Sequence, residues 1–231
     1  MIYVMSDIHG CYEKYRQMLD LIRFGEKDTL YILGDVVDRG PDGIRLLLDM
    51  MERKNVVPLC GNHEVLARTL LKRLTGPSIL YSKKLVELSE SWLQDGGETT
   101  FQAFAALDQE TGDKVLNYMN SFLIYEELMV NGREFFLSHT VPEKEMMLNF
   151  DSCKWENFVM GEPEYEKQYF DDRYLITGHT PTGLIESGSL GKIWKKNHHI
   201  AIDCGAVFGN SLGCICLDTM EEFYAEGEYT V

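Results

Sequence analysis

Short apolar runs that end in polar residues recur along most of the chain. Five such runs lie in residues 3–9, 31–40, 57–64, 135–139 and 175–179. Runs of a few apolar residues bounded by glycine and polar residues are typical of buried strands. Polar residues at the carboxyl ends of neighbouring strands meet at one edge of a sheet. The pattern therefore predicts strands whose ends bring their polar residues to one place.

Helical periodicity fills the gaps between the first three runs. Residues 12–22 and 41–51 place apolar side chains at helical spacing, and Pro41 suits the first turn of the second helix. Alternating strands and helices predict βαβ units and a mainly parallel sheet. Both helices follow a candidate site loop, so their positive amino-terminal ends would face that site and favour anions there.

The segment 64–120 is helical in pattern and carries no candidate metal ligand. The sequence Asp95-Gly96-Gly97 predicts a break between helices near residues 81–93 and 99–107. We interpret the segment as a helical insert, which could cover the core or take part in substrate choice. Glu64, at its start, is interpreted as a helix-start residue near a positive dipole and not as a ligand.

The rest of the chain is rich in strand patterns. Residues 122–130 and 134–138 are predicted strands joined by a tight turn at Asn131-Gly132. The stretch 142–173 is polar, aromatic and irregular, which predicts a long loop over the site. Further short antiparallel strands are predicted at residues 185–187, 193–194, 199–203, 213–217 and 222–225. Because no linker or repeat interrupts it, the chain is expected to form a single domain of class α/β over residues 1–231.

Composition narrows the function classes. With 231 residues, of which 45% are hydrophobic, the chain is long enough to bury a sizeable core. Its formal charge of -15 argues against an extended nucleic-acid partner, because phosphate backbones are held by clustered Lys and Arg. A small phosphate is compatible with that charge, since bound cations would dominate the local field.

The chain has no sequence feature of a membrane protein. The apolar start, Met1–Met5, is typical of a first strand and lacks the basic leader of a signal peptide. No run approaches the roughly 18 apolar residues that a spanning helix needs. We therefore expect a cytoplasmic protein with no membrane partner. The six cysteines form no C-x-x-C pair and are expected to be buried free thiols.

The polar residues at the strand ends are of the types that bind divalent cations. Asp35 can give one oxygen to each of two cations and is the expected bridging ligand. Asp7 and His9 lie two positions apart, so both can leave the same face of a strand end and complete one site. The expected ligands of the other site are Asn62, His139 and His179. This mixture of ligands suits Mn²⁺, Fe or Zn²⁺, and two such cations can generate hydroxide and clamp an in-line displacement, which predicts phosphoester hydrolysis.

The departing oxygen of a phosphoester needs a proton, and His63 is not needed as a ligand. We predict His63 as the general acid, with Asp38 accepting its other ring N–H to fix the tautomer. Arg39 presents a planar fork that matches two phosphate oxygens. The substrate phosphate is therefore expected to contact Arg39, Asn62 and His63.

These residues form motifs that resemble those of a known family. The motifs are Asp7-x-His9, Gly34-Asp35-x-Val-Asp38-Arg39-Gly40, Gly61-Asn62-His63-Glu64, His139 and Gly178-His179. In their order along the chain and in their residues they resemble the motifs of the phosphoprotein phosphatase branch of the calcineurin-like metallophosphoesterases. The resemblance implies a four-layer α/β/β/α sandwich, a dinuclear site most often loaded with Mn²⁺, and hydrolysis of phosphomonoesters. It also implies that Asp38 and His63 form the proton-donating pair and that Arg39 binds phosphate.

The closing segment, residues 202–209, resembles the small bacterial and phage members of this branch. Those members include protein phosphatases and symmetrical dinucleoside tetraphosphate hydrolases. Two positions depart from the family pattern. Thr140-Val141 follows His139 in place of a small residue and a glycine, and Lys154 stands beside Trp155 where relatives carry a second phosphate-binding arginine. A lysine there would act as a point charge without bidentate geometry.

Three hypotheses of function follow. The first is a metal-dependent phosphatase of the serine/threonine protein type or of small phosphomonoesters, whose partner is a phosphorylated protein or small phosphoester. The alternative is a hydrolase of a nucleotide substrate, cutting a phosphoanhydride in a dinucleoside polyphosphate, such as a symmetrical tetraphosphate, or in a nucleotide cap. The third is a non-catalytic metal-binding scaffold, which the presence of Asp38, Arg39 and His63 argues against.

Overall fold

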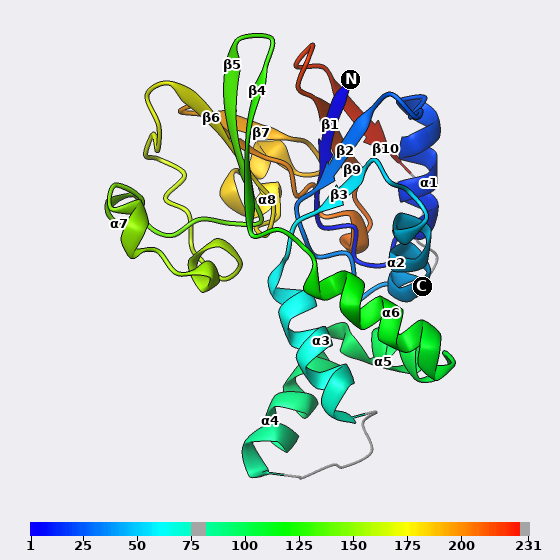
Figure 1. The fold of residues 1–231 in the computed structure, drawn as a ribbon. Coiled ribbons are helices and arrows are strands. Elements are labelled where there is room, and N and C mark those ends of the chain that lie inside the picture. Colours follow the sequence, from blue (N-terminus) through cyan, green and yellow to red (C-terminus); the bar gives the residue numbers. More distant parts are fainter. Residues whose placement is uncertain (75–81, 227–231) are drawn as a thin grey trace.

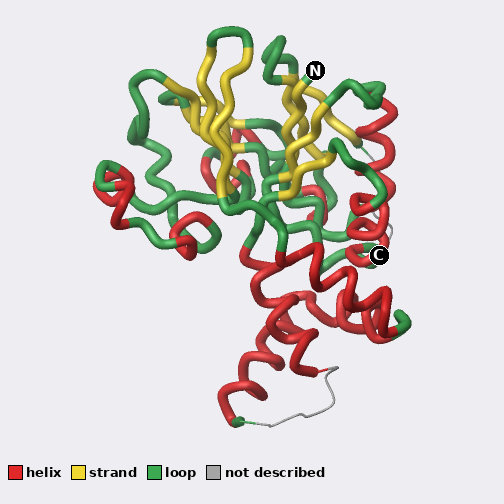
Figure 2. The backbone as a smooth tube through the Cα atoms, viewed as in Figure 1, coloured by secondary structure: helices red, strands yellow, loops and turns green. Residues whose placement is uncertain are grey.

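Two five-stranded sheets face each other in the computed structural model, which describes residues 1–74 and 82–226 (Figure 1 and Figure 2). The first sheet has the order β10-β9-β1-β2-β3, with β1 (Ile2–Met5), β2 (Thr29–Ile32), β3 (Val56–Pro58), β9 (Leu212–Cys216) and β10 (Glu222–Ala225). The second has the order β4-β5-β6-β8-β7, with β4 (Tyr125–Val130), β5 (Arg133–Ser138), β6 (Arg173–Thr177), β7 (Trp194–Lys196) and β8 (His199–Ala201).

The first sheet buries both of its faces. Val4 belongs to the core between the sheets, whereas Tyr3 and Met5 belong to the core under the helices α1 (Tyr12–Leu21) and α2 (Gly43–Met51). This alternation is the period of two that a strand imposes on its side chains. The strands β1, β2 and β3 are parallel, which confirms the predicted βαβ units, and β9 and β10 extend the sheet in antiparallel fashion.

The second sheet is covered on its outer face by a long irregular segment. Phe135 and Leu137 point into the core between the sheets, while Phe136 points outward and stacks on Tyr125. The covering segment contains α7 (Lys144–Met147), η2 (Phe150–Ser152) and η3 (Trp155–Phe158). The predicted α/β class and layered sandwich are confirmed, with a fourth layer made of loop and short helical turns.

A group of helices lies at one end of the sandwich, between β3 and β4 in the chain (Figure 1). It consists of α3 (Asn62–Leu74), α4 (Lys83–Trp92), η1 (Leu93–Gly97), α5 (Glu98–Ala105) and α6 (Gln109–Asn120). The predicted break at residues 95–97 is confirmed, because Asp95 and Gly96 leave the helical conformation there. The predicted start of the preceding helix, Tyr81, lies outside the described residues. Buried side chains of this group join the core under the first sheet, so the helices pack as one body with it.

Two predictions about the later strands are wrong. Residues 185–187 form no strand: the chain makes α8 (Thr182–Ile185) and then η4 (Ser187–Ser189). Glu186 and Ser187 are exposed and Ile185 is only partly buried, so this stretch lacks the buried face that a strand needs. In addition, β8 runs parallel to β6 and antiparallel only to β7. The predicted strands at 213–217 and 222–225 are confirmed as β9 and β10.

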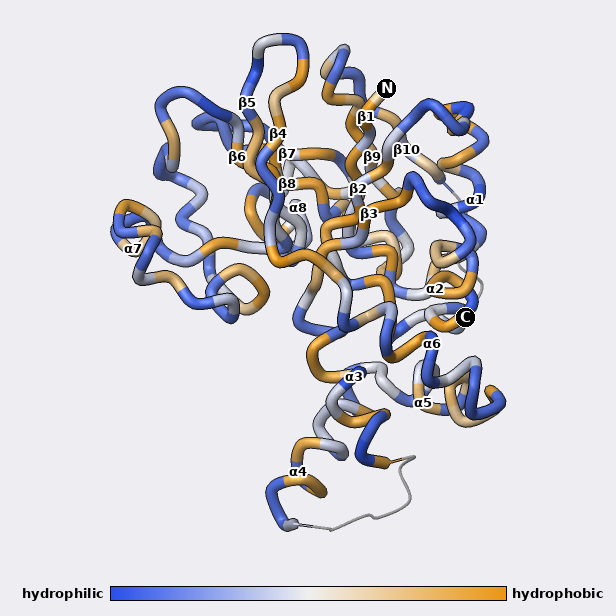
Figure 3. Tube along the Cα trace, viewed as in Figure 1, coloured by the Kyte–Doolittle hydropathy of each residue, from blue (hydrophilic) through white to orange (hydrophobic). Residues whose placement is uncertain are grey.

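Hydropathy along the chain follows the layers, with apolar strands and polar connecting loops (Figure 3). All six cysteines are free, and five of them are buried, with Cys153 partly exposed. None of the described helices is long and apolar enough to cross a membrane.

The hairpin between β4 and β5 tests how local conformation contributes to stability. Asn131 and Gly132 have φ values of 50° and 78°, as a two-residue turn of this kind requires. Gly132→Ala should lower the free energy of unfolding by about 1 kcal/mol, because an L side chain disfavours the left-handed region. An added Cβ would meet no atom within 4 Å, so no clash contributes. Urea unfolding measures the change.

Gly188→Ala is the matched control. Gly188 also has open space around it but lies outside the left-handed region. The substitution should therefore leave stability unchanged or raise it slightly. An equal loss in both variants would show that the hairpin conformation is not the cause.

Candidate active site

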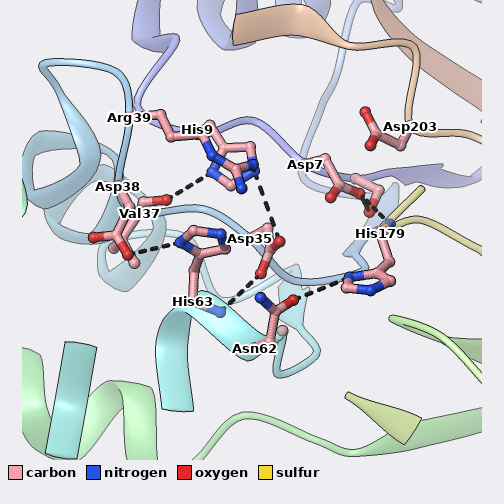
Figure 4. Close-up of polar contacts among 12 residues, drawn as sticks. Asp7, His9, Asp35, Val37, Asp38, Arg39, Asn62, His63, His179 and Asp203 are labelled. Atoms are coloured by element: carbon pink, nitrogen blue, oxygen red, sulfur yellow. Dashed lines mark hydrogen bonds and ion pairs between the residues drawn. The ribbon is translucent and has the colours of Figure 1, made fainter. Parts of the chain in front are cut away.

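Loops that follow five strands bring the predicted site residues together (Figure 4). The strands and the residues that follow them are β1 with Asp7 and His9, β2 with residues 35–39, β3 with Asn62 and His63, β5 with His139, and β6 with His179. Both sheets therefore contribute, and the site lies where their strand ends meet.

The Glu64 carboxylate joins two of these loops. Its Oε1 accepts hydrogen bonds from the backbone N–H of Val36 (2.8 Å) and Val37 (3.2 Å). Its Oε2 accepts from Asp35 (2.8 Å) and Gly61 (2.9 Å). Burial, and then the nearby Asp35 charge, raise the pKa of Glu64 to about 7, although these hydrogen bonds oppose the rise. Glu64 starts α3 as predicted, and it also fixes the loop that carries Asp35.

Six site residues have a backbone in the left-handed region. Their φ values are 51° for Asp7, 44° for His9, 52° for Asp35, 69° for Asp38, 66° for Arg39 and 69° for His179. Residues other than glycine disfavour this region, at a cost of order 1–3 kcal/mol each, and such strain clusters at functional sites. The fold therefore tolerates strain at the residues that the strand-end pattern selects.

Three ligand atoms converge at one side of the site. Asn62 Oδ1, His139 Nε2 and His179 Nδ1 lie 2.9 to 3.0 Å from one another. His139 Nδ1 donates to the Leu33 carbonyl at 2.7 Å, which leaves its Nε2 lone pair facing this point. Asp35 Oδ2 lies 3.5 Å from the same Nε2. The lone pairs of these nitrogen and oxygen atoms point at one place, which favours the binding of a cation there.

His9 presents a ligand atom to Asp35 from the other side. Its Nδ1 donates to the Val37 carbonyl at 2.9 Å, so its Nε2 faces the site, 3.7 Å from Asp35 Oδ2. Burial lowers the pKa of His9 to about 3, and burial with the adjacent His139 lowers that of His179 to about 4. These imidazoles are therefore neutral at pH 7 and keep the lone pair that a metal requires.

Asp7 contributes a carboxylate with one free oxygen. Its Oδ2 accepts from Ser6 Oγ and from the His179 backbone N–H, the latter at 2.9 Å. Its Oδ1 is buried and has no hydrogen-bond partner among the described residues. A buried carboxylate oxygen without a partner is costly, and a bound cation would satisfy it. The donor set of this site thus fits divalent cations.

Two compact groups of possible metal ligands share Asp35. They are His9, Asp35 and His63 in one, and Asp35, His139 and His179 in the other. Within each group, one ligand atom per residue lies within 4.8 Å of the others. The sequence predicted Asp7 as the third ligand beside His9 and Asp35, whereas His63 lies in that compact group in the structure.

His63 is paired with Asp38, as its predicted role requires. His63 Nδ1 donates to Asp38 Oδ2 at 2.7 Å. Burial lowers the pKa of His63, but the carboxylates of Asp35 and Asp38 outweigh it, so the pKa is raised overall. The protonated form has no lone pair for a metal and holds a proton on Nε2. Trp92 Nε1 donates to the same Asp38 oxygen at 2.7 Å, and the Asp38 backbone N–H donates to Thr100 Oγ1 at 2.9 Å.

The Arg39 guanidinium lies at the edge of the site. Its Nη1 donates to His9 Nε2 at 2.7 Å, and its Nη2 lies 3.4 Å from Asp95 Oδ1. Its Cζ lies 5.6 Å from the centre of the Phe208 ring, and the Phe208 residue is 61% exposed. The Arg39 backbone N–H donates to the Gly96 carbonyl at 2.9 Å. Lys154, predicted near a second arginine position, is exposed and forms no ion pair among the described residues.

Several groups of the helical insert were missed from the sequence. No role in the site was predicted for four residues of this insert that contact Asp38 or Arg39: Trp92, Asp95, Gly96 and Thr100. The only hint in the sequence that the insert reaches the site was a tryptophan and an aspartate beside Gly96-Gly97, and this hint is weak. Nothing in their spacing pointed to residues 38–39, because these contacts are long-range.

Asp203 is a further residue that received no role from the sequence. It follows β8, is buried, and lies on the same side of the site as Asp7 in Figure 4. Burial raises the pKa of Asp203 to about 7, although the N–H of Gly205 opposes the rise. An apolar run followed by a carboxylate, at residues 199–203, is the same signal that identified the other strand ends.

Comparison with known proteins identifies the family. Residues 1–183 match the calcineurin-like phosphoesterase family. The chain belongs to this family, and it is a phosphoester hydrolase with a site for divalent metals. The scaffold hypothesis is therefore not required.

Curated relatives include several tetraphosphatases. The asymmetrical bis(5'-nucleosyl)-tetraphosphatase PrpE of Oceanobacillus iheyensis is 26% identical over 241 residues, which cover 90% of this chain and 85% of that protein. The symmetrical bis(5'-nucleosyl)-tetraphosphatase of Wigglesworthia glossinidia brevipalpis is 45% identical over 65 residues, or 27% of this chain. Those 65 residues span only 24% of the Wigglesworthia protein.

Solved structures share the fold. A candidate diadenosine tetraphosphatase aligns with a TM-score of 0.69 at 15% identity and covers 99% of this chain and 94% of its own. A serine/threonine phosphatase from Saccharomyces cerevisiae aligns with a TM-score of 0.61 at 14% identity, covering 100% of this chain and 81% of its own. At these identities the likeness concerns the fold alone.

The hydrogen bond from Trp92 to Asp38 can be tested by a single substitution. Trp92→Phe removes the N–H donor and keeps an aromatic ring in this buried position. A hydrogen bond to a charged group is worth about 1.5–3 kcal/mol, and its loss should loosen Asp38 and the imidazole that it orients. We expect kcat for phosphoester hydrolysis to fall roughly tenfold with KM unchanged, because Trp92 acts through Asp38.

Trp155→Phe serves as the control, since Trp155 is 41% exposed. It should leave both kinetic constants at their original values. A rise in KM at constant kcat in Trp92→Phe would contradict the positioning role.

Proposed function

We propose that this protein hydrolyses a phosphoanhydride bond in a dinucleoside polyphosphate. The observation that carries the proposal is the similarity to a tetraphosphatase along nine-tenths of the chain, 26% identical with 85% of that relative covered. The phosphatase hypothesis, first choice from the sequence, has weaker support, because the serine/threonine phosphatase is similar in fold at only 14% identity.

The cations would be held in two places that share one carboxylate. Asp35 would bridge them, with Asp7 and His9 on one side. The residues on the other side would be Asn62, His139 and His179. Oxygen and imidazole ligands without thiolate favour Mn²⁺, and Fe or Zn²⁺ suit them as well. When bound, the two cations supply Lewis acidity and a hydroxide nucleophile at neutral pH.

His63 would protonate the departing oxygen. Its Nδ1 is occupied by Asp38, so the proton available for transfer lies on Nε2, at the side that faces Asp95. The Asp38 carboxylate keeps the protonated form populated and fixes the ring. The His63 side chain is 1% exposed, so the ring is largely shielded from bulk solvent.

Arg39 would hold the phosphoryl group, and Phe208 would receive a nucleobase. We call the Arg39 guanidinium and His63 Nε2 the phosphate seat. The Phe208 ring lies against the guanidinium, 5.6 Å from ring centre to Cζ, and exposes most of its surface. Stacking on an aromatic ring tolerates any base. A nucleotide end extending from the seat would therefore find an apolar platform beside it.

A panel of three substrates tests the proposal. With the Mn²⁺-loaded protein, we expect kcat/KM for diadenosine tetraphosphate to exceed that for a phosphothreonine peptide and for p-nitrophenyl phosphate by at least about tenfold, or about 1.4 kcal/mol. Chromatography of the products, as two ADP or as ATP with AMP, identifies the bond cut. A higher value for the phosphopeptide would overturn the proposal in favour of a protein phosphatase.

Two variants tie the activity to this site. His63→Asn should retain both metals and lower kcat by roughly 10²–10⁴-fold on the phosphothreonine peptide, whose leaving oxygen needs a proton, with a smaller loss on p-nitrophenyl phosphate. Phe208→Ala should lower kcat/KM for the dinucleotide by roughly 5- to 100-fold, since base stacking is worth about 1–3 kcal/mol, and should spare p-nitrophenyl phosphate. An equal effect on both substrates would show that the ring supports Arg39 and does not receive a base.

A further inference from the structure

The Asp95 carboxylate lies against the phosphate seat. Its Oδ1 is 3.4 Å from Arg39 Nη2, and its Oδ2 is 3.7 Å from His63 Nε2. One oxygen thus faces each of the two groups that would bind a phosphoryl group. The Asp95 side chain is 57% exposed, whereas that of His63 is 1% exposed. An anion entering from solvent therefore meets this negative charge at the seat.

The turn between α4 and α5 fixes the position of this carboxylate. Asp95 has φ −86° and ψ 19°, and Gly96 has φ 98°, within the break between the two helices. The Gly96 carbonyl accepts from the Arg39 N–H at 2.9 Å. A Cβ at Gly96 would lie 2.6 Å from that Arg39 nitrogen, so only glycine allows the approach. The turn that presents Asp95 is thus bound to the backbone of the arginine that Asp95 contacts.

We propose that Asp95 is a specificity-determining residue that disfavours doubly charged phosphoryl groups at the seat. The inference rests on the role that the proposed function gives to Arg39 and His63. An internal phosphate of a dinucleoside polyphosphate carries one negative charge. A phosphomonoester and inorganic phosphate carry nearly two above their second pKa of about 6. At a separation near 4 Å in water, each additional negative charge beside Asp95 lowers affinity about fivefold.

This placement gives the helical insert a part in substrate choice. The Asp95 carboxylate would weaken the binding of inorganic phosphate and of terminal phosphomonoesters at the seat. It would weaken the binding of an internal phosphoryl group less. Because the interaction is Coulombic and partly exposed, salt should reduce it. Asp95→Asn keeps the size and shape of the side chain and removes only the charge.

Two chromogenic substrates that lack a nucleotide test the inference independently of the natural substrate. At pH 8, p-nitrophenyl phosphate is doubly charged and bis-p-nitrophenyl phosphate is singly charged. We expect Asp95→Asn to raise kcat/KM for the monoester at least about fivefold, through KM, and to change the diester less than about twofold. Calorimetry of inorganic phosphate binding to the Mn²⁺-loaded protein should show a similar gain in affinity, a readout that needs no turnover.

Glu98→Gln is the matched control, because it removes the same charge from the same turn region. Glu98 contacts only Gln102 among the described polar groups. The Glu98→Gln variant should leave kcat/KM for both chromogenic substrates and the affinity for inorganic phosphate unchanged. Equal changes for monoester and diester, no change, or weaker phosphate binding in Asp95→Asn would each overturn the inference. Absence of phosphate binding to both proteins would overturn the placement of the seat itself. None of these outcomes depends on whether diadenosine tetraphosphate is a substrate.

Discussion

The hydrogen bonds of the Glu64 carboxylate are the interaction on which the geometry of the site depends. Four backbone N–H groups from the loops after β2 and β3 converge on its two oxygens. A buried carboxylate is tolerated only when it is well hydrogen-bonded, so removing these donors and keeping the charge would be costly. The loop of Asp35 and the start of α3 at Asn62 are therefore held in one arrangement. Of the left-handed site residues, Asp35 donates to Glu64 directly, and this bond helps to hold its strained conformation.

The helical insert provides a second set of constraints on the same loop. Trp92 and Thr100 hold Asp38, while Gly96 binds the Arg39 backbone. The sheets thus position the ligand residues, and the insert positions the pair that would move the proton and the arginine that would bind phosphate. Substitutions in the insert could therefore change the surroundings of Asp38 and Arg39 without touching the strand-end residues.

Much of the fold and the ligand set could be predicted from local pattern. Each apolar run and its following polar residue are neighbours in sequence, and parallel pairing forces the strand ends to one edge. The strand predicted at 185–187 is wrong because tertiary packing leaves Glu186 and Ser187 exposed, which so short a run cannot reveal. The contacts of Trp92 and Asp95 could not be found from spacing, since they join segments more than fifty residues apart. The roles proposed for Asp95 and Phe208 in substrate choice were equally hidden, because their contacts with Arg39 are long-range.

The central claim is that a single carboxylate, Asp35, holds two divalent cations together. Titration of Mn²⁺ into the metal-free protein, followed by calorimetry and elemental analysis, tests it most directly. Two equivalents should bind to the natural chain, and Asp35→Asn should weaken both, since its amide cannot offer two anionic oxygens. Circular dichroism would show that the variant remains folded. Two tightly bound equivalents in Asp35→Asn, or a single equivalent in the natural chain, would contradict the shared-ligand account.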